Sequence, residues 1–104
     1  MGTFVRVADV KDIPVSEALV IEEQGHSIAI FNVSGNLHAM NNICPHQGGP
    51  LGEGIMDGHN IICPLHGWQF DCRNGEAVGD GHGVSVQVYQ VKTEGNDILV
   101  EIPD

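Results

Sequence analysis

Residues 44–66 read CPHQGGPLGEGIMDGHNIICPLH and contain two short modules separated by a glycine-rich segment. The first module is Cys44-Pro45-His46 and the second is Cys63-Pro64-Leu65-His66. Each module supplies one thiol and one imidazole, and the proline directly after each cysteine restricts that cysteine to extended backbone. Two such loops lying side by side form a cage of four metal ligands.

Two thiolates and two imidazoles can bind either a zinc ion or an iron–sulfur cluster. A Cys2His2 zinc finger usually collects its cysteines in one module and its histidines in another, which is helical. Here each module mixes one cysteine with one histidine, and no helical run flanks either module. In a two-iron centre with unlike ligands, one iron takes both cysteines and the other takes both histidines. The mixed modules therefore favour a two-iron centre, with zinc or another mononuclear metal as the alternative.

The two modules and the residues after them resemble a known family. CPHQGGPL at 44–51, CPLHGWQFD at 63–71 and Asn74-Gly75 together are similar to the Rieske iron–sulfur proteins, specifically the small soluble Rieske-type ferredoxins. The similarity covers nearly the whole chain. It implies one 2Fe-2S cluster, with two cysteines on one iron and two histidines on the other and with the imidazoles at the protein surface. The ligands would be Cys44, His46, Cys63 and His66.

The expected fold is all-β, a Rieske-like antiparallel sandwich or barrel with a cluster-binding subdomain of two loops. A first strand is predicted at 3–8, and a hairpin at 17–23 and 26–33, because apolar β-branched runs flank a glycine-containing break. The sequence predicts one domain over residues 1–104, with its cluster-binding part at about 42–83. No helix of substantial length is predicted, and the remaining strands are expected at 37–40, 61–62, 68–72, 84–92 and 97–102.

The surroundings of the cluster bear on its reduction potential. High-potential members of the family carry a serine and a tyrosine that donate hydroxyl hydrogen bonds to the cluster, whereas this chain has Trp68 and Phe70 at the matching places. Those relatives also carry an extra cysteine in each loop, where this chain has Gly49 and Leu65. Hydrogen bonds to cluster sulfur stabilise the reduced state, so the missing donors predict a potential of roughly −150 mV, near the lower end of the Rieske range.

The third cysteine and the other histidines have simpler interpretations. Cys72 shares a strand face with Trp68 and Phe70 by the two-residue period and is expected to be a small core residue. The glycine-rich segment at 79–83 stands where relatives place a proline-containing loop beside the cluster, which changes the shielding expected there. The remaining histidines are expected to be loop residues in solvent: His26, His38, His59 and His82.

Composition narrows the classes of partner. The chain has 104 residues, with 4 Lys and Arg against 14 Asp and Glu, a formal net charge of −10 and a pI of about 4.7. This balance argues against nucleic acid and anionic membrane surfaces as partners. The acidity either steers the domain toward a basic patch on a partner or simply keeps it dissolved. No signal peptide or membrane anchor is evident at the N-terminus, so a cytoplasmic location is expected.

The family resemblance implies a soluble one-electron carrier rather than an enzyme. It would pass electrons from a flavoprotein NAD(P)H reductase to a terminal oxygenase of the aromatic-ring-hydroxylating dioxygenase kind. A monomer that forms transient complexes is expected, because its docking face would be small. This face would surround the two ligand histidines and include Pro45, Gln47, Gly48, Pro50, Pro64 and Leu65.

Two alternatives remain from other classes of protein. One is the small Rieske-like subunit of an assimilatory nitrite reductase, although many such subunits lose ligands and all four are present here. The other is a zinc-stabilised, non-redox binding module. A red-brown protein with labile sulfide would support the cluster, and a colourless protein with one zinc would support the binding module.

Overall fold

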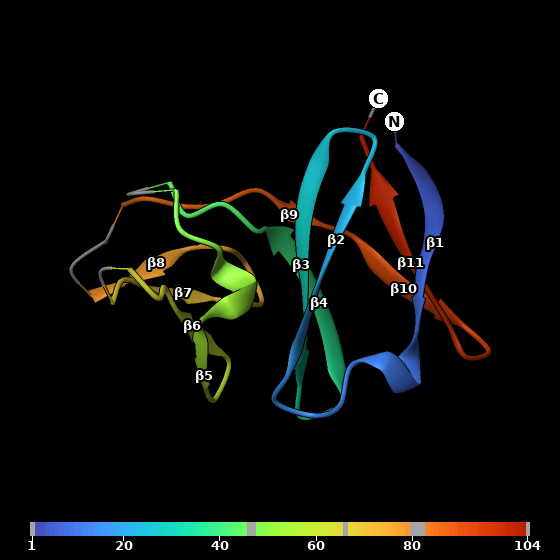
Figure 1. Ribbon diagram of the computed structural model, residues 1–104, viewed down its shortest axis with the longest axis horizontal. Coiled ribbons are helices and arrows are strands. Elements are labelled where there is room, and N and C mark those ends of the chain that lie inside the picture. The colour runs from blue at the N-terminus through green and yellow to red at the C-terminus, as the bar shows by residue number, and fades with distance from the viewer. Residues whose placement is uncertain (1, 46–47, 66, 80–82, 104) are drawn as a thin grey trace.

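The computed structural model describes residues 2–45, 48–65, 67–79 and 83–103. Within these ranges the chain consists of antiparallel strands and two single-turn 3-10 helices, η1 (Val10–Asp12) and η2 (Leu51–Glu53). Figure 1 shows two parts, which we call the base and the tip. The base carries β1–β4 and β9–β11, and the tip carries β5–β8, η2 and the two loops that contain Cys44 and Cys63.

The base consists of two antiparallel sheets. Their strand orders are β1-β11-β10 and β2-β3-β4-β9. Apolar side chains of both sheets form one buried core, which includes Ile30, Tyr89, Ile98 and Val100. The two chain ends lie next to each other in the first sheet, where Thr3 pairs with Ile102 (Figure 1). The base strands are β1 (Thr3–Asp9), β2 (Ala18–Glu23), β3 (His26–Val33), β4 (Asn36–Asn41), β9 (Val88–Tyr89), β10 (Val91–Glu94) and β11 (Asp97–Ile102).

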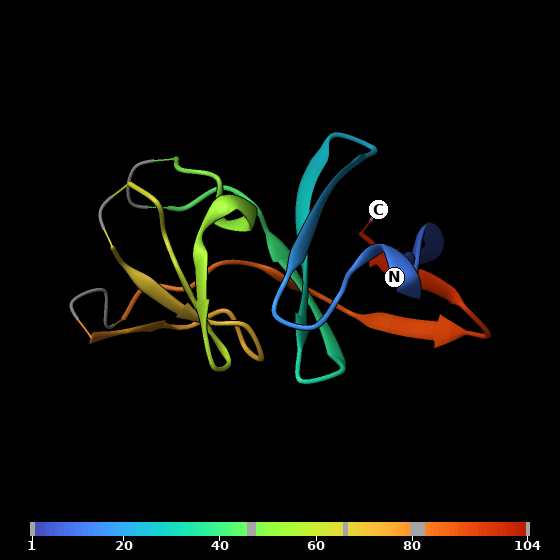
Figure 2. The same ribbon diagram turned by 60° about the horizontal axis from the view of Figure 1, so that its bottom comes forward.

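Strand β3 connects the base to the tip. Successive side chains of a strand point to opposite faces, and all of residues 28–31 are buried here. Ile28 and Ile30 pack into the base core, whereas Ala29 and Phe31 pack into a second core that belongs to the tip. One strand therefore supports both parts, and the tip is seated on the outer face of the second base sheet, as the turned view in Figure 2 also shows.

The tip contains a small four-stranded sheet in the order β5-β6-β7-β8. Its core gathers Leu51, Ile61 and Phe70 around the cysteines of both loops. Strand β6 runs directly into the second loop and β7 leaves it, so this loop is the end of a hairpin in which Ile62 pairs with Gln69. The tip strands are β5 (Ile55–Asp57), β6 (Asn60–Ile62), β7 (Gln69–Asp71) and β8 (Ala77–Val78).

Most of the predicted strands are confirmed, and one is wrong. The first strand, the β2–β3 hairpin and the strands near 37–40, 61–62, 68–72 and 97–102 are all present. The predicted continuous strand at 84–92 begins only at Val88 and is broken at Gln90, because the chain changes sheets there. Strand β9 pairs with β4, whereas β10 pairs with β11. Strands β5 and β8 were not predicted. Across the described ranges, no helix has the length and apolar character needed to cross a membrane.

Candidate metal centre

The first loop folds back tightly after Cys44. The backbone N–H of Cys44 donates to the carbonyl oxygen of Gly49 at 2.8 Å, and the N–H of Gly48 donates to the carbonyl oxygen of Cys44 at 2.7 Å. Gly48 has a φ of 74°, a left-handed conformation that glycine adopts without strain. The glycine after the first module thus allows the chain to turn back beside its own cysteine.

The second loop repeats this pattern. The N–H of Cys63 donates to the carbonyl oxygen of Trp68 at 2.7 Å, and the N–H of Gly67 donates to the carbonyl oxygen of Cys63 at 3.1 Å. Gly67 has a φ of 75°, nearly the same as Gly48 in the first loop. The two modules, which have different sequences after their prolines, therefore form matched turns that each hold one cysteine at the start.

The two loops touch at Gly49. A side-chain Cβ placed on this buried glycine would lie 2.9 Å from Cγ of Leu65 and 3.2 Å from Sγ of Cys63. Both distances are closer than ordinary van der Waals contact. The absence of a side chain at Gly49 lets the first loop approach the sulfur of the second, which brings the two modules together as the sequence predicts.

Both candidate cysteines face the interior of the tip. Cys44 is 1% exposed and Cys63 is 2% exposed, and both belong to the tip core. The other two predicted ligands, His46 and His66, lie outside the described residues. Among the residues that are described, no group of three or more histidine, cysteine or acidic side chains gathers as a metal site. The described half of the predicted ligand set is thus two buried sulfurs, one from each of two touching loops.

This donor set suits an iron–sulfur cluster better than a reactive thiol site. Thiolate sulfurs that are shielded from water are the usual protein ligands of such clusters. The third cysteine behaves differently, because burial and, to a smaller extent, the neighbouring Asp71 raise the pKa of the Cys72 thiol to about 12. Cys72 is therefore a neutral core thiol, as predicted, and it lies after β7 rather than in either loop.

A buried carboxylate closes the turn that follows β7. Asp71 accepts hydrogen bonds from the backbone N–H of Arg73 at 2.8 Å and from the guanidinium Nε and Nη2 of Arg73 at 3.0 and 2.8 Å. The bonds from Arg73 hold the pKa of Asp71 below its ordinary value, against the effect of burial. Nε2 of the exposed His59 lies 3.7 Å from the same carboxylate. These contacts fix the chain direction between the second loop and β8.

Two of the histidine predictions are wrong. His26 begins β3, and its Nδ1 lies 3.2 Å from the hydroxyl of Tyr89 in a half-buried pair. His38 lies within β4, where burial lowers its pKa. Both lie within segments that the sequence itself predicted as strands, at 26–33 and 37–40, and both are half-buried rather than in solvent. His59 is in an exposed turn as predicted, and His82 lies outside the described residues.

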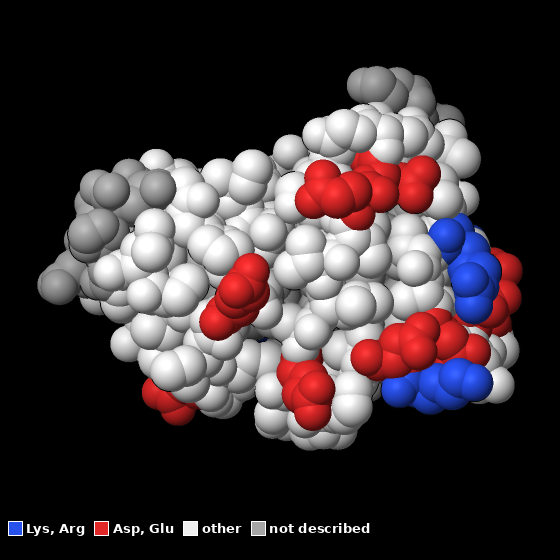
Figure 3. Space-filling model, in the orientation of Figure 1, with Lys and Arg blue, Asp and Glu red and all other residues white. Residues whose placement is uncertain are grey.

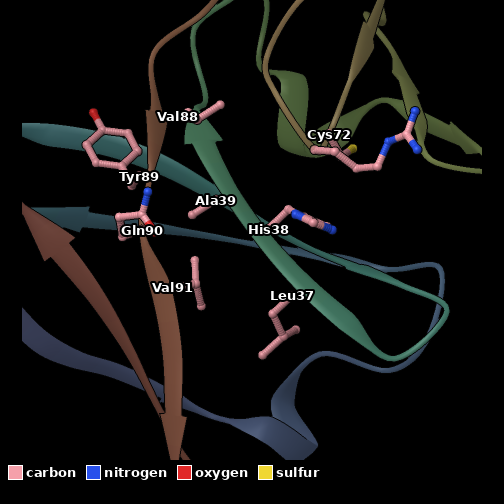
Figure 4. A pocket seen from close by; sticks show the side chains of 9 residues that line it. Leu37, His38, Ala39, Cys72, Val88, Tyr89, Gln90 and Val91 are labelled. Carbon is pink, nitrogen blue, oxygen red and sulfur yellow. The ribbon is translucent and has the colours of Figure 1, made fainter.

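His38 lines a shallow cavity between the base and the tip. Figure 4 shows His38 and Cys72 on the same side of β4, while Tyr89 lies on the far side of β9. The cavity holds about 170 Å³. Pockets for small-molecule ligands usually have ~300–1,000 Å³. Neither Cys44 nor Cys63 lines it, so it is separate from the candidate metal centre.

Sequence reasoning missed one residue beside the first loop. Asn42 is a buried polar residue whose side chain bonds both to β3 and to the returning end of the loop. It stands just before the predicted module, but its partners are Ser27 and Gly52, which no sequence motif connects to it. In the sequence, the only feature that could have drawn attention to Asn42 is its polar amide between two apolar stretches.

Comparison with known proteins agrees with this geometry. A family profile described as Rieske [2Fe-2S] domain matches residues 3–90. The biphenyl dioxygenase ferredoxin subunit of Pseudomonas sp. (strain KKS102) is 34% identical over 95% of this chain and 92% of its own. The 3-phenylpropionate/cinnamic acid dioxygenase ferredoxin subunit of Shigella flexneri serotype 5b (strain 8401) is 35% identical over 91% of this chain and 90% of its own.

Solved structures agree as well. The ferredoxin of carbazole 1,9a-dioxygenase from Nocardioides aromaticivorans IC177 superposes with a TM-score of 0.88 and 28% identity, covering 94% of this chain and 96% of its own. A putative small subunit of an NADPH nitrite reductase shares the fold alone, with a TM-score of 0.81 and 17% identity over 94% of this chain and 97% of its own. The profile match and the matched cysteine loops together show that this chain belongs to the Rieske [2Fe-2S] domain family.

Proposed function

We propose that this protein is a one-electron carrier, a Rieske-type ferredoxin. It takes single electrons from a flavin-dependent NAD(P)H reductase and passes them to a terminal oxygenase, of the kind that hydroxylates aromatic rings. Two relatives that are ferredoxin subunits of dioxygenases support this role, at 34% and 35% identity. This chain covers 92% and 90% of their lengths, so the similarity extends over nearly the whole of each relative.

We further propose that Cys44 and Cys63 bind one iron of a 2Fe-2S cluster and that His46 and His66 bind the other. The observation that carries this assignment is the repeated turn, in which each cysteine makes the same two backbone hydrogen bonds to the glycine-containing end of its own loop. The contact of Gly49 with Cys63 supports it, because both modules must reach one cluster. When bound, the cluster supplies reversible one-electron chemistry at a higher potential than an all-cysteine cluster would have.

The surface around the loops suits brief contacts with a partner. No charged residue occurs in 42–52 or in 61–70, although the chain as a whole carries a charge of −10. In Figure 3 most of the acidic side chains on this face lie over the base, and a few lie over the tip. Pro45, Gly48, Pro64 and Leu65 are exposed, Pro50 is half-buried, and Gln47, the sixth residue of the expected docking face, lies outside the described residues.

An uncharged docking face on a strongly acidic protein can combine two effects. The carboxylates can steer the carrier toward a basic patch on the oxygenase or reductase, because charge complementarity raises association rates. The small apolar face then holds the complex weakly enough to separate after one electron has passed. We therefore propose a monomer that acts in the cytoplasm, where NAD(P)H is supplied, and that has no oxygenase activity of its own.

The first test is chemical analysis of protein purified without oxygen. We expect a red-brown protein with equal amounts of iron and acid-labile sulfide. After dithionite reduction, the electron paramagnetic resonance spectrum should have an average g below that of an all-thiolate cluster, because histidines bind one iron. Reduction of the protein by NADH should require a flavoprotein reductase, and transfer onward should require a terminal oxygenase.

Each alternative gives a different result. A colourless protein that contains zinc and no sulfide would replace the carrier with a zinc-stabilised binding module. Stable copurification with a large sirohaem protein would indicate the nitrite reductase subunit. An average g equal to that of an all-thiolate cluster would contradict the assignment of His46 and His66 while leaving a redox role in place.

A further inference from the structure

We propose that Asn42 is a positioning residue that clamps the first ligand loop to the base and thereby holds Cys44 at the cluster. This inference rests on the carrier function proposed above and adds to it a residue outside both ligand modules. Asn42 follows directly after β4 and stands two positions before Cys44. It is therefore at the point where the chain leaves the base and enters the tip.

Asn42 bonds to both parts of the molecule. Toward the base, its backbone N–H donates to the carbonyl oxygen of Ser27 at 2.9 Å, and its Nδ2 donates to Oγ of Ser27 at 3.3 Å. Toward the loop, its carbonyl oxygen accepts from the N–H of Leu51 at 2.6 Å, and its Oδ1 accepts from the N–H of Gly52 at 2.7 Å. One residue thus joins β3 to the returning end of the loop with four hydrogen bonds.

The side-chain amide is suited to this position. It offers a donor and an acceptor on one short stem, so it can bond to a hydroxyl and to a backbone N–H at once. Asn42 is only 8% exposed, and a buried N–H that loses its partner is costly. The clamp continues toward the cysteine, because Ile43 forms a bridge with Pro50 and Cys44 bonds to Gly49. Displacement of Asn42 would therefore be transmitted to Cys44.

The second loop has no need of such a clamp. It is the end of the β6–β7 hairpin, and the paired residues Ile62 and Gln69 close its base through the sheet. The first loop returns through η2, which belongs to no sheet. Its returning end is also tightly placed, because a Cβ on Gly52 would lie 2.3 Å from Cγ2 of Val20 and 3.0 Å from Oδ1 of Asn42. The first loop has only the isolated bridge between Ile43 and Pro50 where the second loop has a strand pair, and the amide of Asn42 adds hydrogen bonds to this weaker closure.

Asn32 offers a matched control within the base. Its Nδ2 donates to the carbonyl oxygen of Ile13 at 2.7 Å, and its Oδ1 accepts from the N–H of Gly35 at 2.8 Å. It is on β3, half-buried, and bonds two segments through the same chemistry as Asn42, but it lies away from both ligand loops. Asn42→Ala and Asn32→Ala therefore each remove two side-chain hydrogen bonds, and only the first removes them beside Cys44.

The experiment measures the rate of cluster release from the holoprotein in the presence of an iron chelator. The loss of visible absorption reports this release. Each variant is measured at the same interval below its own Tm. We expect Asn42→Ala to release the cluster about tenfold faster than the wild type, the factor expected when a buried N–H loses its partner. Its reduction potential and paramagnetic resonance line shape should change as well. Asn32→Ala should lower the Tm and leave release, potential and line shape at wild-type values.

A conservative variant completes the test. Asn42→Asp keeps the acceptor for Gly52, so it should restore slow release, while its negative charge should lower the reduction potential. Equal release rates for Asn42→Ala and Asn32→Ala would overturn the proposal. If Asn42→Ala does not fold, Ser27→Ala can replace it, because this variant removes only one hydrogen-bond partner of Asn42. A cluster release rate for Ser27→Ala no higher than that of the wild type would overturn the proposal. Absence of sulfide from the wild-type protein would instead contradict the proposed function itself.

Discussion

The base and the tip are both built from antiparallel strands, but different interactions hold them. Strands β1 and β3 of the base have 7 and 8 residues, whereas β5, β6 and β7 of the tip have 3 each and β8 has 2. The base is shaped by long ladders around an apolar core. The tip is shaped by glycine turns, by side chains that bond to backbone, and by a core that includes the two cysteines. Stability and redox function can therefore be altered separately.

The largest expected effect is loss of the cluster on removal of a single sulfur. Cys44→Ser and Cys63→Ser should each abolish cluster binding, because one iron would lose a thiolate ligand. The base should keep its β-sheet circular dichroism, since its core contains neither cysteine. Cys72→Ala is the control, and it should keep the cluster at a cost of about 1 kcal/mol in stability. Stoichiometric sulfide in either serine variant would contradict the ligand assignment.

The base core and the tip core can be compared by making the same substitution, isoleucine to alanine, in each. Ile30 and Ile61 are both fully buried, the first in the base core and the second in the tip core. Replacement of either by alanine should lower the free energy of unfolding by ~2–5 kcal/mol, measured by urea denaturation. Only Ile61→Ala should also accelerate cluster release at a temperature well below its Tm. Equal acceleration by Ile30→Ala would show that the two cores do not act separately.

Two adjacent glycines separate strain from crowding in the first loop. Gly48→Ala meets nothing within 4 Å but forces an L-residue to a φ of 74°, so it should cost ~1–2 kcal/mol and leave the cluster spectrum unchanged. Gly49→Ala would push against Leu65 and Sγ of Cys63. Leu65 is 54% exposed and can move aside, but the cysteine cannot. We expect a changed resonance spectrum for Gly49→Ala, and an unchanged one would contradict the close contact of the loops.

The sequence predicted local features of the fold well. The β2–β3 hairpin follows from two apolar β-branched runs around Gln24-Gly25, and its turn and both its strands are contiguous in the chain. The break at Gln90 was missed because the alternation of apolar and polar residues through 84–92 looks the same whether the segment pairs with one sheet or with two. Strands β5 and β8 were missed because short strands in glycine-rich sequence carry little periodicity.

In the candidate site, too, the features that are local in sequence were predicted and those that depend on tertiary contacts were not. The cysteines could be found because each module is a contiguous motif, and the matched turns around them follow from the glycines nearby. Asn42 could not be found, because its partner Ser27 is fifteen positions away on another strand. The contact between Gly49 and Cys63 likewise depends on how the two loops approach each other. Sequence motifs thus identify ligands, and tertiary structure identifies what holds them in place.

The reduction potential should respond to donors placed beside the second loop. Trp68→Ser combined with Phe70→Tyr introduces two hydroxyls beside Cys63, one at the end of the second loop and one in β7, which leaves that loop. Hydrogen bonds to cluster sulfur should raise the potential, by on the order of 50 mV for the pair, measured by protein-film voltammetry. Trp68→Ala with Phe70→Leu is the control without hydroxyls. A potential that stays the same or falls in the hydroxyl variant would contradict the account.

The smallest effect concerns two ion pairs, one in each part of the molecule. Asp71 pairs with Arg73 in the tip with only 10% of its side chain exposed, whereas Asp97 pairs with Arg6 in the base with 51% exposed. Because the pKa of Asp71 is lowered in the folded state, its stabilisation is present above the ordinary value of 3.8 and is lost as the pH falls through the folded-state pKa. At pH 7, Asp71→Asn should therefore lower the Tm by a few degrees. The loss in free energy of unfolding should be about 1 kcal/mol or less, because Arg73 is exposed. Below pH 4 the difference in Tm between the variant and the wild type should shrink. Asp97→Asn should leave the Tm unchanged at every pH, and an equal loss from both variants would show that burial of Asp71 contributes nothing.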